Sequence, residues 1–228
     1  MNLKPGFYAL VGPNAAGKTY YLHSLMGPHA AFVPAGADAK FAGTTVGDHL
    51  RAARTARPMS RVDFPDARIK NLSVGQRRLL TIEVALATGA ELLLLDEPFD
   101  GIDVATRKQV RQRLIDYLAE SPERTVIMAS HRPEDFAGLA THVIQVFGRE
   151  VSRPVALDEA RLCFPTVTGP TAEIEELAAR FPVAESSSLG PTTRATFAEP
   201  LRDEECRLPI SYPDDAELID LLATERTA

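Results

Sequence analysis

The sequence has few features that would indicate secretion, a membrane span or nucleic-acid binding. Its cysteines, Cys163 and Cys206, have no metal-like spacing, and no secretion signal precedes Lys4. The longest apolar runs, such as Leu92 to Leu95, are far too short to cross a bilayer. The net charge is −6 without a basic block, which excludes the electrostatic footprint of a nucleic-acid binder. We therefore expect a cytoplasmic protein with free thiols and no nucleic-acid partner.

The composition is that of an ordinary soluble globular protein. Of the 228 residues 45% are apolar and 25% are charged, so the chain can bury a sizeable core. Past Gly148 proline becomes frequent, and Ser186 to Ser188 predicts a loop. We expect a main domain over residues 1–150 and a small α+β extension over residues 151–228.

Gly12 to Thr19 read G-x-x-x-x-G-K-T and follow the apolar run Phe7 to Val11. Between a strand and a helix, this spacing turns backbone N–H groups toward phosphates, places the Lys18 ammonium beside the β/γ oxygens and offers the Thr19 hydroxyl to Mg²⁺. The alternative is a plain glycine-rich turn. The expected nucleotide-binding residues are Gly12, Pro13, Asn14, Ala15, Ala16, Gly17, Lys18, Thr19 and Tyr20.

Hydrophobic patterns predict an α/β fold with a mostly parallel sheet flanked by helices. The expected strands are residues 7–11, 30–33, 92–95, 125–130 and 142–147. Helices are expected after the phosphate loop, after a hydroxyl cap at 44–45 and running through Ala53, after the caps Ser73 and Asp103, and over 134–139, and a linker covers 58–65. In the extension we expect strands at 162–168 and 193–198 and helices at 171–181 and 215–222.

Two acids and a histidine follow buried strands. Asp96 and Glu97 end the run Leu92 to Leu95, and His131 follows the strand 125–130. At such an edge Asp96 can hold Mg²⁺, whereas Glu97 can orient and deprotonate a water molecule. The alternatives are a solvated strand end for the acids and an exposed loop residue for His131.

The motifs stand in the order phosphate loop, LSVGQ, LLLLDEP and histidine, and over residues 3–148 this order resembles the nucleotide-binding subunit of an ABC transporter. The resemblance matches, by position, Gly12–Thr19 to the Walker A loop, Leu72–Gln76 to the ABC signature, Leu92–Asp96 to the Walker B strand, Glu97 to the catalytic carboxylate, Gly101–Asp103 to the D-loop and His131 to the switch histidine.

This resemblance implies a P-loop NTPase with a small helical subdomain that carries the signature and a reduced antiparallel β subdomain. It implies hydrolysis of ATP, with Glu97, His131 and Lys18 as catalytic residues and Mg²⁺ held by Thr19 and Asp96. In the family, Ser73, Gly75 and Gln76 meet ATP bound to a second subunit. A head-to-tail homo- or heterodimer is therefore implied; the alternative for Ser73 is an ordinary helix cap.

The sequence departs from the family pattern at several places. Ala35 stands where the Q-loop glutamine is expected, Ala15 replaces a phosphate-loop glycine, and Val74 replaces a signature glycine. The chain begins only eleven residues before Gly12, so we expect an N-terminally shortened domain without the usual adenine-stacking aromatic. Candidates for that contact are Tyr20, Tyr21 and Phe41.

The extension resembles that of bacterial ABC-2 exporter ATPases, from residues such as Val167 to Pro170. A bare structural cap is the alternative. We expect an ATPase subunit that drives a separate integral-membrane partner, with an exporter as the expected type, and that associates peripherally with the inner face of the cell membrane through it. The rivals are an ATP-binding regulatory module with little hydrolysis and a non-transport ABC ATPase, which the 55 positions between Lys18 and Ser73 disfavour.

Overall fold

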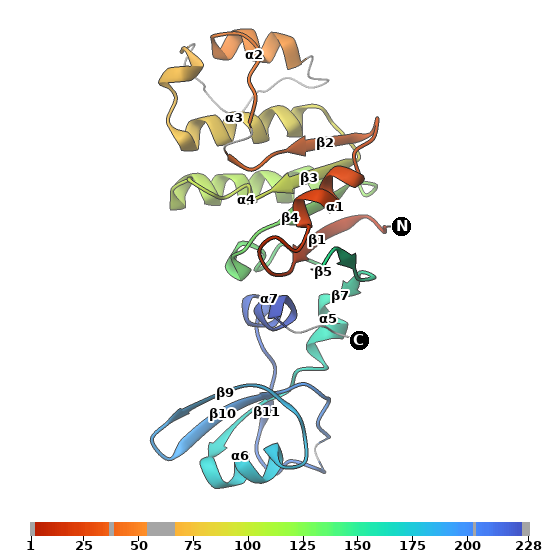
Figure 1. Ribbon diagram of the computed structural model, residues 1–228, viewed down its shortest axis with the longest axis vertical. Coiled ribbons are helices and arrows are strands. Elements are labelled where there is room, and N and C mark those ends of the chain that lie inside the picture. The colour runs from red at the N-terminus through yellow and green to blue at the C-terminus, as the bar shows by residue number, and fades with distance from the viewer. Residues whose placement is uncertain (1–2, 37–38, 54–66, 203, 225–228) are drawn as a thin grey trace.

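The computed structural model describes residues 3–36, 39–53, 67–202 and 204–224. Its main sheet has the order β2-β3-β4-β1-β5, and all pairs of these strands are parallel (Figure 1). Two short strands add antiparallel pairs to β5. The strands are β1 (Gly6–Val11), β2 (Ala30–Val33), β3 (Leu92–Asp96), β4 (Thr125–Ala129), β5 (His142–Phe147), β6 (Glu150–Val151) and β7 (Val155–Ala156).

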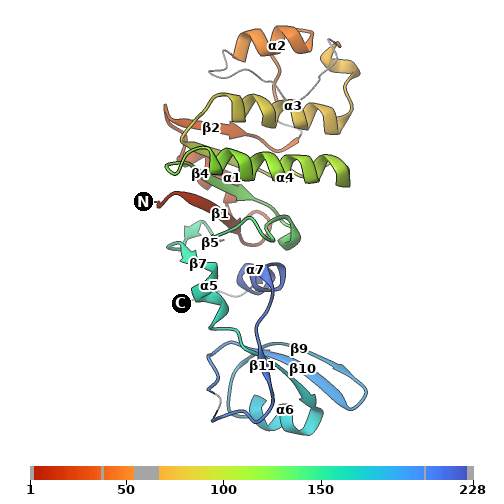
Figure 2. The same cartoon turned by 180° about the vertical axis from the view of Figure 1, so that it is seen from behind.

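Helices cover both faces of this sheet, which explains why the strands are apolar without alternation. Leu22 of α1 packs with Tyr8 and Leu10 on one face, whereas α3 and α4 supply Ile82 and Leu114 to the other (Figures 1 and 2). The helices of this part are α1 (Lys18–Ser24), α2 (Val46–Ala53), α3 (Val74–Ala87), α4 (Val104–Ala119) and α5 (Leu157–Arg161). The predicted α/β class is confirmed.

A small helical part lies beyond β2. The helix α2, the 3-10 turn η2 (Ile69–Asn71) and the start of α3 share a core of Val46, Leu72 and Leu80. It carries the LSVGQ segment, as the resemblance implied. Between β1 and β3 the described strands comprise only β2, which is parallel, so an antiparallel β subdomain is not seen there in the described residues. The predicted linker 58–65 lies outside the described residues.

The predicted helix at 134–139 is wrong. The structure has a single 3-10 turn, η3 (Pro133–Asp135), after which Phe136 and Leu139 bury their side chains in the main core. Gly138 adopts a φ of +67°, a left-handed conformation that a continuing right-handed helix does not accommodate.

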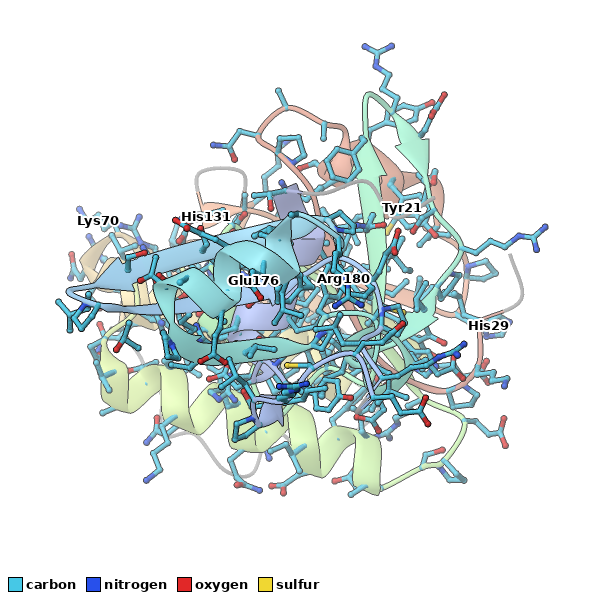
Figure 3. The ribbon with its side chains drawn as sticks, turned by 90° about the horizontal axis from the view of Figure 1, so that it is seen from below. Tyr21, His29, Lys70, His131, Glu176 and Arg180 are labelled. Carbon is cyan, nitrogen blue, oxygen red and sulfur yellow. The ribbon has the colours of Figure 1, made fainter. Side chains whose placement is uncertain are left out.

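A separate antiparallel sheet with the order β11-β8-β10-β9 follows (Figure 1). Its core comprises Val167, Ile174, Leu177, Ala195 and Phe197, with α6 over one face. Figure 3 views the molecule from this end and labels Glu176, on α6, and Arg180, just past the end of that helix. The elements are β8 (Thr166–Pro170), α6 (Thr171–Ala178), β9 (Val183–Leu189), β10 (Thr192–Phe197) and β11 (Ile210–Ser211).

Two predictions for this region are wrong. The strand expected at 162–168 begins only at Thr166, because Leu162 ends α5. The serines expected to form a loop lie in β9, where Ser186, Ser187 and Ser188 pair with β10. β9 is an exposed edge strand, so its side chains need no apolar partner, and Ser188 instead bonds the Thr193 hydroxyl at 2.8 Å.

The last helix, α7 (Asp215–Thr224), returns to the main core. Leu218, Ile219 and Leu222 are buried with residues of the parallel sheet, and Gln145 Nε2 of β5 donates to the Leu222 carbonyl at 2.5 Å. Leu157 and Ala160 of α5 join the same core. The division at residue 150 remains a prediction, but α5 and α7 pack with the first part rather than with the second sheet. No helix within the described ranges is long and apolar enough to span a membrane.

Candidate functional site

The loop between β1 and α1 lies at the carboxyl edge of the sheet. Gly12 has a φ of +140°, and a Cβ there would lie 2.1 Å from the carbonyl oxygen of Val146, so glycine is required. Gly17 begins α1 with a φ of +110°. Lys18 is buried, and its Nζ donates to the carbonyls of Gly12 at 2.7 Å and Pro13 at 3.1 Å. The loop therefore wraps around the ammonium group.

Other residues of this loop show how it faces solvent. Pro13, Asn14 and Ala15 are exposed, whereas Ala16 is buried and its carbonyl accepts a hydrogen bond from the Arg149 amide at 2.9 Å. Ala15 has a φ of +61°, the left-handed region that favours glycine. The exposed edge of the loop thus offers its backbone to a ligand, as the spacing predicts.

Asp96 and Thr19 come together at this edge. Asp96 ends β3 and is buried, and the Thr19 hydroxyl donates to Asp96 Oδ2 at 2.8 Å. Burial lowers the pKa of Lys18, while the nearby Glu97 and Asp96 carboxylates raise it. A hydroxyl and a carboxylate are the oxygen donors that Mg²⁺ prefers, so the donor set fits this ion.

Glu97 and His131 form a pair across β3 and β4. His131 Nδ1 lies 2.9 Å from Glu97 Oε2, and the His131 amide donates to the same oxygen at 3.4 Å. The Glu97 amide donates to the Ala129 carbonyl, and Glu97 has a φ of +46°, so the backbone turns sharply after the strand. Asp100, which sequence reasoning did not single out, has a carboxylate within 4.8 Å of the ligand atoms of both residues.

The signature segment, Leu72 to Gln76, lies away from the phosphate loop in the fold. Ser73 accepts from the Gln76 amide at 3.1 Å, and the Gln76 side chain accepts from the Ser73 amide at 2.9 Å, a complete capping box. α3 packs on β2, which β3 and β4 separate from β1 and its loop. Gly75 instead approaches the Gly101 carbonyl, since a Cβ there would lie 3.5 Å from it. Within one chain, Ser73, Gly75 and Gln76 are therefore not brought to the phosphate loop.

Comparison with known proteins shows similarity to one family over part of the chain. The model of the family described as ABC transporter matches residues 35–100. The chain is 32% identical over 104 residues to the ABC transporter ATP-binding protein YtrB of Bacillus subtilis, covering 45% of this chain and 35% of that one. It is 29% identical over 172 residues to the molybdate import ATP-binding protein MolC of Haemophilus influenzae, covering 62% and 68%.

Over part of its length the chain is thus similar to ABC transporter ATP-binding proteins. A third relative is the aliphatic sulfonates import ATP-binding protein SsuB 1 of Rhodococcus jostii, with 37% identity over 90 residues, which covers 40% of this chain and 36% of that one. The chain spans about a third of the length of YtrB and SsuB 1.

Solved structures show the same ABC fold. One, an ATP-binding subunit of an ABC transporter, superposes with a TM-score of 0.60 at 19% identity, covering 69% of this chain and 81% of that one. Another, a metal-chelate type ABC transporter in an inward-facing conformation, has a TM-score of 0.57 at 23% identity and 89% coverage of both chains.

At the position where the ABC motif order predicts the Q-loop glutamine, the chain has the small apolar residue Ala35. Ala35 lines a pocket of about 650 Å³ together with Thr19 and Asp96, so its place agrees with the motif order. Of the aromatic candidates for adenine stacking, Tyr20 is 75% exposed, Tyr21 is partly buried against the core, and Phe41 packs against His49 at 5.0 Å. Among the three, Tyr20 has the ring most open to a ligand.

Proposed function

We propose that this chain binds and hydrolyses MgATP as the ATPase subunit of an ABC transporter whose membrane-spanning part is a separate chain. The observation that carries the proposal is the convergence of three strand ends. β1 leads into the Lys18 loop, β3 ends in Asp96 and Glu97, and β4 leads to His131. A loop built for phosphates beside a carboxylate base is the arrangement that phosphoryl transfer to water needs.

The ligand set divides between nucleotide and metal. Residues Gly12 to Lys18 would hold the phosphates, and Thr19 and Asp96 would hold Mg²⁺ through their oxygens, as their mutual contact of 2.8 Å allows. When bound, Mg²⁺ neutralises charge on the β- and γ-phosphates. Lys18 adds a fixed cation from the protein side.

Glu97 would orient the attacking water and accept its proton. Both contacts with His131 use Oε2, which fixes the carboxylate and leaves Oε1 to face the water molecule. His131 is 44% exposed, so its ring is open to a ligand, and we assign it to the γ-phosphate. In this proposal His131 therefore holds the Glu97 carboxylate in the orientation that a general base needs.

Release of inorganic phosphate from ATP by the purified chain tests this proposal. Lys18→Ala should abolish turnover and Glu97→Gln should slow it at least about 10²-fold while sparing binding, because the amide cannot accept a proton. Lys108→Ala, a matched loss of an exposed lysine on α4, should behave as the parent. If Lys18→Ala and Glu97→Gln both leave turnover unchanged, the assignment of these residues to the ATPase site is refuted.

We further propose an ATP-dependent dimer, because one chain does not complete its own site with Ser73, Gly75 and Gln76. Glu97→Gln should accumulate as a dimer at saturating MgATP, since it binds but does not hydrolyse. Light scattering provides the measurement. A particle that stays monomeric under these conditions would contradict the dimer.

Coupling to a membrane partner, and hence a location at the inner face of the cell membrane, is also proposed. The names of MolC and SsuB 1 describe import, whereas the extension motivated an exporter in the sequence analysis; the direction of transport remains a prediction. Membrane vesicles from cells that make the protein should stimulate its ATPase activity. Vesicles from cells that lack its transporter are the control.

The second candidate, a regulatory module with little hydrolysis, is favoured by Ala35, which brings no polar side chain to the Thr19 and Asp96 pocket. This candidate predicts tight MgATP binding with no phosphate release above that of Glu97→Gln. The same phosphate assay, read beside a binding measurement with a fluorescent ATP analogue, separates the two functions.

A further inference from the structure

Arg78 has an unusual environment on α3, two residues after the signature. Its side chain is only 3% exposed, and Nη1 donates to the carbonyl of Pro34. Nε and Nη2 are buried and have no hydrogen-bond partner among the described residues. Buried donors are nearly always paired, because an unpaired one costs about 1–3 kcal/mol, so this guanidinium needs an explanation.

The segment that Arg78 contacts is the one that lacks the Q-loop side chain. Pro34 directly follows β2, and Ala35 comes next, on the pocket that Thr19 and Asp96 also line. A Cβ on Gly36 would lie 3.0 Å from Arg78 Nη2, so the backbone packs closely on the guanidinium. Arg78 therefore contacts both sides of the position where Ala35 stands.

Charges of the nucleotide site act on the same guanidinium. Burial lowers the pKa of Arg78, while Asp100, Asp96 and Glu97 raise it. These are the acids at the carboxyl end of β3, including the residues assigned to Mg²⁺ and to the attacking water. The buried cation thus lies within the field of the site, although it comes from the signature helix.

We propose that Arg78 is a positioning residue for ATP hydrolysis, which clamps Pro34 to Gly36, on both sides of Ala35, against the signature helix. The proposal rests on the proposed ATPase function. The planar guanidinium can bond the Pro34 carbonyl through Nη1 and still has two further donor nitrogens, Nε and Nη2, whereas a lysine has a single nitrogen. Arg78 would then fix the position of the Thr19 and Asp96 pocket relative to α3.

Steady-state ATPase kinetics give the first test. Arg78→Met keeps an unbranched side chain of similar length and removes the buried charge, so the fold should persist. We expect kcat to fall by about 10–100-fold, the loss typical of residues that orient ligand-contacting groups without contacting the ligand themselves. The Kd for a fluorescent MgATP analogue should change less than about twofold. Arg78→Lys should be intermediate, because it keeps the charge and one donor nitrogen.

A second buried arginine gives a matched control. Arg124 is 4% exposed and lies just before β4, at the opposite edge of the sheet from the site, where Nη1 bonds the Tyr117 carbonyl. Arg124→Met should lower the thermal midpoint and leave kcat as in the parent. If both methionine variants lose turnover in proportion to their lost stability, Arg78 is merely structural and the proposal fails.

A double-mutant cycle tests the link to Ala35. In the parent, Ala35→Gln should change kcat less than about twofold, because the clamp already holds this segment, whereas in Arg78→Met the same change should restore kcat at least about threefold. Equal fold-changes in the two backgrounds would show independent action and overturn the proposal.

A measurement that needs no turnover separates this proposal from the proposed function. Arg78→Met should speed hydrogen exchange of the Ala35 and Gly36 amides, since their segment loses its bond to α3, and Arg124→Met should not. If the parent shows no ATPase activity, the ATPase proposal fails while this exchange result still supports the clamp. Unchanged exchange in Arg78→Met would disprove the clamp whether or not the chain hydrolyses ATP.

Discussion

Ala15 provides a prediction whose magnitude follows from the backbone. Its φ of +61° places a residue with a Cβ in the left-handed region, which costs about 1–2 kcal/mol relative to glycine. Glycine loses about 0.5–1 kcal/mol more conformational free energy on folding, which offsets part of this gain. Ala15→Gly should therefore stabilise the fold by about 0.5–1 kcal/mol. For a chain of this size the thermal midpoint should rise by about 1–4 °C.

The next residue is the matched control. Ala16 is buried against the core on the α1 face and its φ is not positive, so Ala16→Gly gains no relief of strain and loses a buried methyl group. It should destabilise by about 1 kcal/mol or more. Thermal unfolding of the two variants beside the parent should thus give shifts of opposite sign. Two shifts of the same sign would refute the strain assigned to Ala15.

Nucleotide provides a further check on Ala15. A ligand that binds both proteins equally adds the same stabilisation, RT ln(1 + [L]/Kd), to each. The difference in midpoint between Ala15→Gly and the parent should therefore persist at saturating MgATP. If the difference vanishes with nucleotide, the Ala15 strain is present only in the nucleotide-free loop and is relieved when ATP binds.

Other positions give clear expected outcomes. Gly12→Ala should prevent MgATP binding in a calorimetric titration, because its Cβ would lie 2.1 Å from the Val146 carbonyl and the loop would have to move. Ser73→Ala should lower unfolding stability by about 1 kcal/mol in urea through loss of the capping box, with Ser73→Asp as the variant that keeps a cap. Arg161→Met should speed amide exchange in α7, because Arg161 holds Asp215 at 2.5 Å.

Local patterns predicted most of the elements around the site. The Gly12 to Thr19 spacing, the apolar run before Asp96 and the Ser73 cap each depend on residues within one turn or strand, and the structure has β1, β3 and α3 at those places. The convergence of Asp96 with Thr19 also followed, because parallel strands put their carboxyl ends at one edge. Periodicity and turn chemistry suffice where the determining contacts are local.

Arg78 could not be assigned from the sequence, because its role depends on contacts between α3 and the end of β2, 44 residues apart in the chain. In the sequence it is one of two successive arginines after the signature, and such a pair is expected on the solvated face of a helix. The serines of β9 mislead in the same way. Their strand is specified by pairing with β10 rather than by their own propensity.

Helix α7 shows why the boundary drawn from composition does not follow the packing. The chain leaves β11 of the second sheet and crosses back to place α7 on the parallel sheet, where Leu218 and Ile219 are buried. Composition changes along the chain, but an apolar helix face is buried wherever a matching apolar surface is open. α7 and the phosphate loop line one pocket of about 490 Å³, with Ile219 on one side and Pro13 on the other. The residues after 150 therefore contribute a wall beside the proposed nucleotide site, and a fragment that ended at residue 150 would expose the core that α7 covers.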